Sequence, residues 1–134
     1  MVYETDPSLE PVLQKYSCAF LSLAHYNPSF SDQEINSIYD QGIVSEIFDK
    51  ECTILDWQRL ADLLRLPLKY REGHWPVDTD LSNGEWFIGE WCNQLTMHFV
   101  AMDNAGNVIY DPIEGGSKTV ANGHLVSYRI FDKA

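Results

Sequence analysis

The chain divides into a first half whose patterns favour helices and a second half whose patterns favour strands. The helical stretches are an apolar run at 17–24 ended by Asn27-Pro28, a segment opened by a Ser31–Glu34 capping box, and a leucine-striped segment with a capping start at 53–56 and an end at Leu66-Pro67. Residues 68–70, 85–91, 96–102, 108–110 and 125–131 have the composition of strands. Helices that precede the strands, rather than alternating with them, predict an α+β domain in which N-terminal helices pack on a C-terminal antiparallel β-sheet.

Size and charge limit what such a chain can be. Its 134 residues match the usual size of one domain, and no repeat or linker divides them, so residues 1–134 are expected to form a single domain. The net charge of −11 repels phosphate backbones, which disfavours nucleic-acid binding. No apolar run approaches the length of a membrane span, so no membrane contact is expected.

The cysteines and histidines argue against metal sites and disulfides. Cys18, Cys52 and Cys92 are odd in number and form no CxxC pair, which disfavours a disulfide framework and a structural zinc site. No pair among His25, His74 and His124 has ligand spacing, so no metal or other cofactor is expected. The acidic N-terminus lacks an apolar signal core, and together with unpaired thiols this favours a reducing cytoplasm.

A hairpin is predicted where the strand-like runs 96–102 and 108–110 flank the turn-forming residues 103–107. Gly106 can adopt the positive φ that such turns require. The hairpin makes the two runs neighbours. It therefore brings His98 and Asp111 together at the strand ends away from the turn.

Cys18, His98 and Asp111 are the residue types of a nucleophile, its base and the group that orients the base. Cys18 stands at the start of an apolar helical run, where a helix N-terminus favours a thiolate. A histidine across from the thiol can exchange a proton with it, and a carboxylate on the other ring nitrogen selects the useful tautomer. The order and setting of the three residues predict a hydrolase.

On these motifs the chain resembles the papain-like cysteine peptidases, most closely the small bacterial and phage C39-like peptidases. The resemblance rests on Gln14 ahead of Cys18, on His98-Phe99-Val100, and on Asp111-Pro112. It implies a papain-like fold without a cofactor and a peptide or protein substrate. Cys18 would be the nucleophile, His98 the base and later the acid, Asp111 the orienter and Gln14 an oxyanion donor. Gln14 precedes Cys18 by four residues, where the papain pattern has six.

Other interpretations remain open beside this one. The same scaffold can serve as a catalytically inactive binding module that captures a protein partner, or as an amidase of cell-wall peptides, which would require export. Cys92, expected in a loop after the strand at 85–91, is a second choice of nucleophile. The acidic residues Glu4, Asp6 and Glu10 are expected to form a solvated end. The segments 73–78 and 114–117 are expected to be a connection and a turn, and the tryptophans Trp75, Trp86 and Trp91 to serve mainly in packing.

Overall fold

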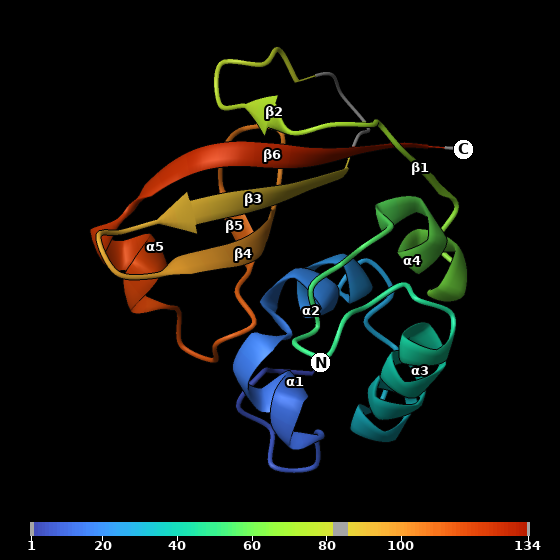
Figure 1. The fold of residues 1–134 in the computed structure, drawn as a ribbon. Coiled ribbons are helices and arrows are strands. Elements are labelled where there is room, and N and C mark those ends of the chain that lie inside the picture. Colours follow the sequence, from blue (N-terminus) through green and yellow to red (C-terminus); the bar gives the residue numbers. More distant parts are fainter. Residues whose placement is uncertain (1, 82–85, 134) are drawn as a thin grey trace.

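The computed structural model describes residues 2–81 and 86–133 (Figure 1). Four helices come first: α1 (Pro11–Tyr16), α2 (Cys18–Ala24), α3 (Asp32–Val44) and α4 (Trp57–Leu63). They are followed by β1 (Leu68–Tyr70), β2 (Trp75–Pro76), β3 (Trp86–Cys92), β4 (Met97–Met102), β5 (Val108–Tyr110), α5 (Lys118–Asn122) and β6 (His124–Lys133).

The strands form one antiparallel sheet in the order β1-β6-β3-β4-β5, and β2 pairs with β6 beside this path. Figure 1 shows α1 to α4 gathered on one side of the sheet, with α5 at the end from which β6 begins. The expected α+β class, with N-terminal helices on a C-terminal antiparallel sheet, is confirmed.

Local signals account for several element boundaries. The Ser31 side chain accepts from the Glu34 N–H and the Glu34 carboxylate accepts from the Ser31 N–H, so the predicted capping box opens α3. The Asp56 carboxylate accepts from the Arg59 N–H and caps α4. In the hairpin between β4 and β5, Gly106 has a φ of 86° and the Asp103 N–H donates to the Asn107 carbonyl at 3.0 Å.

Three short elements were not expected from the sequence. The first, α1, begins with Pro11, which suits a helix start because the missing N–H has no partner there in any case. The second, β2, lies in the expected connection at 73–78. The third, α5, follows the expected turn at 114–117. In addition, β3 runs through Cys92, which was expected in a loop, whereas the expected start of this strand at Glu85 lies outside the described residues.

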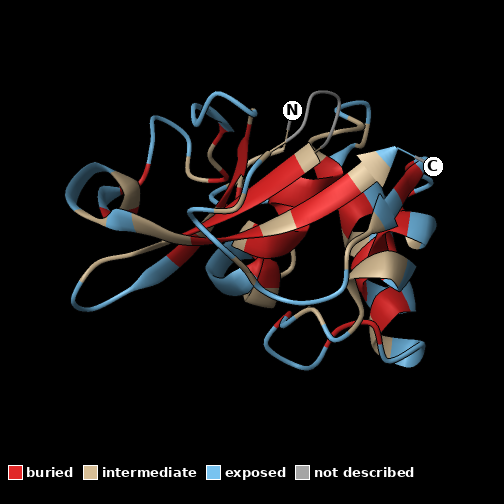
Figure 2. Cartoon of the chain, turned by 90° about the horizontal axis from the view of Figure 1, so that it is seen from above, coloured by how far each residue is buried: buried red, intermediate tan, exposed pale blue. Residues whose placement is uncertain are grey.

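The sheet carries apolar side chains on both faces. One cluster lies between the helices and the sheet and includes Phe20, Ile88 and Phe131. A second cluster, built around Phe87 and Val100, lies apart from it. Figure 2 shows the buried segments running through the strands and the helices beside them. Within this architecture α2 packs against β4, and this contact positions the site described below.

Candidate active site

Cys18 is the first residue of α2, directly after the junction with α1. Ser17 joins the two helices and is buried. The Ser17 hydroxyl donates to the Leu13 carbonyl at 2.5 Å, so its side chain does not cap α2. It turns back because α1 runs directly into the junction and leaves Leu13 within its reach. The first N–H groups of a helix have no acceptor within it, so the Cys18 N–H is available at this end of α2.

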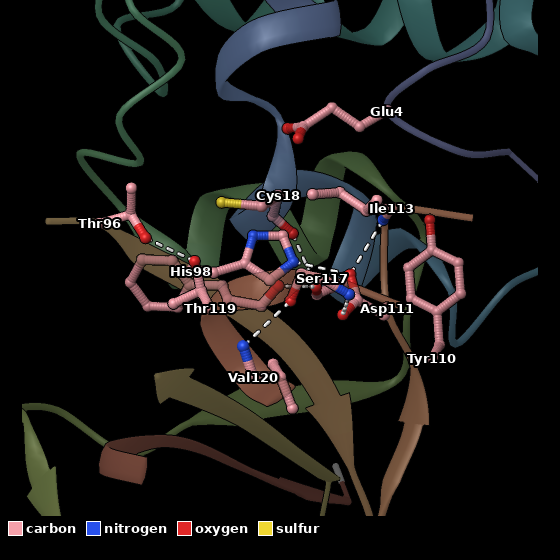
Figure 3. Close-up of polar contacts among 12 residues, drawn as sticks. Glu4, Cys18, Thr96, His98, Tyr110, Asp111, Ile113, Ser117, Thr119 and Val120 are labelled. Atoms are coloured by element: carbon pink, nitrogen blue, oxygen red, sulfur yellow. Dashed lines mark hydrogen bonds and ion pairs between the residues drawn. The ribbon is translucent and has the colours of Figure 1, made fainter. Parts of the chain in front are cut away.

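His98 and Asp111 form a short hydrogen bond across the hairpin. The His98 Nε2 lies 2.7 Å from the Asp111 Oδ1. Asp111 follows β5 directly and accepts two further hydrogen bonds, from the Ile113 N–H at 2.9 Å and from the Ser117 N–H at 3.0 Å. The turn at 112–116 therefore wraps around the carboxylate and fixes its orientation (Figure 3).

Cys18 faces the other ring nitrogen of His98. Figure 3 shows the Cys18 sulfur beside the nitrogen that is not bonded to Asp111, which is Nδ1. The structure thus brings together the three residues that the sequence singled out, in the order sulfur, imidazole, carboxylate.

The environment of His98 favours its protonated form. Burial alone would lower the pKa of His98, but hydrogen bonds to Asp111 and Cys18, and the negative charges of both, outweigh it and raise the pKa to about 9. Burial works against the charge of Asp111 as well. Its hydrogen bonds from His98 and the Ile113 N–H, together with the imidazolium charge, nevertheless lower the pKa of this carboxyl. At neutral pH the pair is an imidazolium next to a carboxylate.

Ser22 joins α2 to β4 beside the site. Its hydroxyl lies 2.6 Å from the Cys18 carbonyl oxygen and 3.1 Å from the Phe99 carbonyl oxygen, and the residue is fully buried. Phe99 follows His98 in β4. This bifurcated contact sets the spacing between Cys18 and His98. Ser22 could not be recognised from the sequence, because there it resembles any small residue within an apolar helix.

Gln14 is not brought into the site. Its side chain is exposed on α1, and its amide donates to the Leu9 carbonyl at 2.8 Å and to the Pro7 carbonyl at 3.5 Å. The amide is therefore occupied in closing the turn that precedes α1. The structure gives no support to the oxyanion role that the resemblance implied for Gln14.

Glu4 corrects another expectation, because it does not belong to a solvated end. It is only 7% exposed, its N–H donates to the Pro112 carbonyl at 2.7 Å, and its carboxylate accepts from the Ser17 hydroxyl at 3.4 Å. Figure 3 shows the carboxylate turned toward the chain that leads into Cys18. Burial raises the pKa of Glu4 to about 7, although the His98 charge and the Ser17 hydrogen bonds oppose the shift.

A cleft of about 380 Å³ opens beside the Cys18 thiol. One wall comes from the α1–α2 junction, another from residues 51–54 and Trp57, and the third from Phe99 and Arg129 on the sheet. Cys52 reaches this cleft but is almost fully buried, and burial raises the pKa of its thiol far above the ordinary value. Cys92 ends β3 opposite Met97 and is not among the residues that line the cleft.

Comparison with known proteins identifies the family. Residues 1–133 match the family described as "Protein of unknown function, DUF261". The chain belongs to this family. No curated protein and no solved structure matches it.

Two kinds of feature are absent from the part of this DUF261 chain that the structure describes. Within residues 2–81 and 86–133, no group of three or more His, Cys, Asp or Glu side chains is arranged to hold a metal ion. In the same part of the chain, no helix is both long and apolar enough to cross a membrane.

Proposed function

We propose that the chain is a cysteine peptidase on a papain-like, C39-like domain, and that it hydrolyses a peptide or amide bond through Cys18, His98 and Asp111. The observation that carries the proposal is the arrangement around the imidazole. Nε2 of His98 is held by Asp111 at 2.7 Å, while Nδ1 faces the Cys18 sulfur at the edge of a cleft. A thiol, a base and a group that orients the base, in this geometry, are the parts of nucleophilic catalysis on a carbonyl.

The first half of the reaction transfers the acyl group to Cys18. The Cys18 thiolate attacks the carbonyl carbon, a C–S bond forms, and the Cys18 N–H at the helix start stabilises the oxyanion. The His98 imidazolium then gives its proton to the amine nitrogen, the C–N bond breaks and the amine leaves. Because the pKa of His98 is about 9, this proton is present at neutral pH.

The second half releases the acid. Neutral His98 takes a proton from a water molecule, whose oxygen attacks the thioester carbon. The C–S bond breaks, the carboxylic acid departs, and the thiolate and the imidazolium are restored. Asp111 keeps Nδ1 directed at the sulfur throughout, since its own position is fixed by two backbone N–H groups.

A catalytically inactive module that captures a protein partner is the second candidate, and the placement of Gln14 favours it. The amide expected to assist the oxyanion is bonded to Leu9 and Pro7 instead. Without a side-chain donor, stabilisation of the oxyanion would rely on backbone N–H groups alone.

Turnover of a peptide-amide library tests the proposal. We expect wild-type protein to cleave members of the library. Cys18→Ala and His98→Ala should each abolish cleavage, because the nucleophile and the base act as one unit. Asp111→Asn should retain a weak remnant. Gln14→Ala should leave the chemical step nearly unchanged, because its amide is used elsewhere.

Cys92→Ala is the matched control, since it removes a thiol outside the cleft and should retain full activity. Circular dichroism verifies the folding of each variant. If wild type and Cys18→Ala leave every substrate intact and bind the same partner equally well, the binding module is the correct interpretation.

A further inference from the structure

The sheet wall of the cleft carries a fixed positive charge at Arg129. Its side chain is 14% exposed, and it shares the cleft with the Cys18 thiol. The guanidinium carbon lies 5.4 Å from the centre of the Phe99 ring and 6.0 Å from that of the Trp57 ring, and both rings line the same cleft. Both rings are within cation–π range of the guanidinium and confine it on two sides.

One corner of the guanidinium is anchored to the sheet. The Arg129 Nη1 donates to the Ser127 hydroxyl at 3.0 Å and lies 3.6 Å from the Glu90 Oε1. The Ser127 hydroxyl in turn donates to the same Glu90 oxygen at 2.6 Å, and the His74 Nε2 lies 3.2 Å from it. The charge of Glu90 is therefore shared among three partners and only partly offsets that of Arg129.

The edge of the guanidinium formed by Nε and Nη2 is not used by the contacts described above. Within the described residues, the Nε and Nη2 of Arg129 have no protein hydrogen-bond partner, and neither atom is fully buried. These two N–H groups point in parallel from one edge, with the spacing that receives both oxygens of a carboxylate. The same cleft is also lined by Lys15 and by the acidic Glu51 and Glu90, so the preference for a carboxylate depends on the free edge of Arg129 and not on the overall charge of the cleft.

We propose that Arg129 is a specificity-determining residue that binds a carboxylate of the substrate, so that the cleft selects acidic peptides. The inference rests on the proposed peptidase function. The carboxylate can belong to an acidic side chain or to a C-terminus, since the fork recognises both alike. A protein with a net charge of −11 repels anions as a whole, so a local arginine is needed to accept one.

Binding is measured first, in the Cys18→Ala variant, because this variant lacks the nucleophile and cannot cleave the peptide. End-blocked peptides that differ only by Glu or Gln at one position test whether the bound carboxylate belongs to a side chain. Peptides with a free or an amidated C-terminus test whether it belongs to the C-terminus. Tryptophan fluorescence reports binding, since Trp57 lies in the cleft. We expect one of the two acidic series to bind about 10- to 100-fold more tightly than its neutral twin, as hydrogen bonds to charged groups do.

The variants place the effect on Arg129. Adding Arg129→Gln to Cys18→Ala should remove the preference for the acidic peptide, so that the acidic and neutral peptides of a pair bind with equal affinity. Arg129→Lys keeps the charge without the fork and should lose most of the preference. Arg59→Gln removes an exposed arginine of α4 and should have no effect.

Turnover by proteins that retain Cys18 separates the two proposals. We expect Arg129→Gln to raise KM for the acidic substrate at nearly constant kcat. Acidic preference in binding without any cleavage supports the carboxylate site and refutes the peptidase. Cleavage by wild type that does not distinguish acidic from neutral twins in either series overturns the carboxylate site and leaves the peptidase standing. The peptide comparison in wild type requires no variant to fold.

Discussion

The three cysteines of the chain lie in three different environments. Cys18 is half-buried beside a protonated imidazole, Cys52 is buried among apolar groups, and Cys92 ends a strand outside the cleft. Thiolates, not thiols, react with alkylating agents, so the neighbours of each sulfur decide its reactivity.

We predict that iodoacetamide modifies Cys18 first near neutral pH and Cys52 last. The Cys18 sulfur faces the positively charged ring of His98, whereas burial raises the pKa of Cys52. Mass spectrometry of the folded protein maps the modified residue over time. His98→Ala should slow labelling of Cys18 by on the order of tenfold or more while Cys92 labels at its original rate. Equal, slow labelling of all three cysteines would contradict the catalytic interpretation.

At the scale of elements, the contact between α2 and β4 sets the distance from sulfur to imidazole. Ser22→Ala removes the hydroxyl that bridges the Cys18 and Phe99 carbonyls. We expect the free energy of unfolding to fall by about 1 kcal/mol and hydrolysis to fall with it, because two partly buried carbonyls lose a donor and α2 can shift. Urea unfolding and turnover measure the two effects. Ser37→Ala, on the exposed side of α3, is the control.

The junction of α5 with β6 requires a residue without a side chain. A Cβ at Gly123 would lie 2.2 Å from the Thr119 carbonyl oxygen and 2.4 Å from that of Cys92. Both are backbone atoms, and Cys92 is held in the sheet, so neither can yield cheaply. Gly123→Ala should therefore destabilise the fold by about 2 kcal/mol or more. Thermal or urea unfolding tests this, with Lys118→Ala in the same helix as the control. Unchanged stability of Gly123→Ala would mean that the junction relaxes freely.

At the scale of the whole molecule, protons held in the site link stability to pH. The pKa of Glu4 rises from 4.5 to about 7 and that of His98 from 6.5 to about 9. The native state thus keeps both protons after the unfolded chain has released its own. The Glu4 contribution to stability is complete below pH 4.5 and is lost as pH rises toward 7, and that of His98 is lost between 6.5 and 9.

We predict that Glu4→Gln removes the loss of stability that Glu4 causes as the pH rises from 4.5 toward 7. The variant should gain roughly 2–3 kcal/mol relative to wild type between pH 5 and pH 8. Glu4 faces His98, Asp111, Cys52 and Tyr110, and the difference between the two proteins isolates it from groups such as His25, whose pKa burial lowers. Urea unfolding of both proteins across this range is the measurement. Parallel stability curves would show that Glu4 is ionised throughout.

Local sequence patterns were sufficient to predict several helix starts and the hairpin turn of this molecule. The capping box at Ser31, the cap at Asp56 and the turn at Gly106 each involve residues within a few positions of one another, so their chemistry is readable along the chain. Because the turn pairs β4 with β5, the nearness of His98 to Asp111 followed from the same short range.

The surroundings of the site depended on contacts between distant segments. Glu4 is buried because the N-terminal residues fold over Pro112, and Ser22 meets Phe99 across 77 positions of sequence. Arg129 reaches the cleft of Cys18 through the pairing of β6 with β3. The chain alone predicts which groups can react, because reactivity and local structure depend on residue type and near neighbours. The burial of a side chain and the charges around it depend on packing between distant segments. Only the tertiary structure therefore decides which distant residues share one cleft.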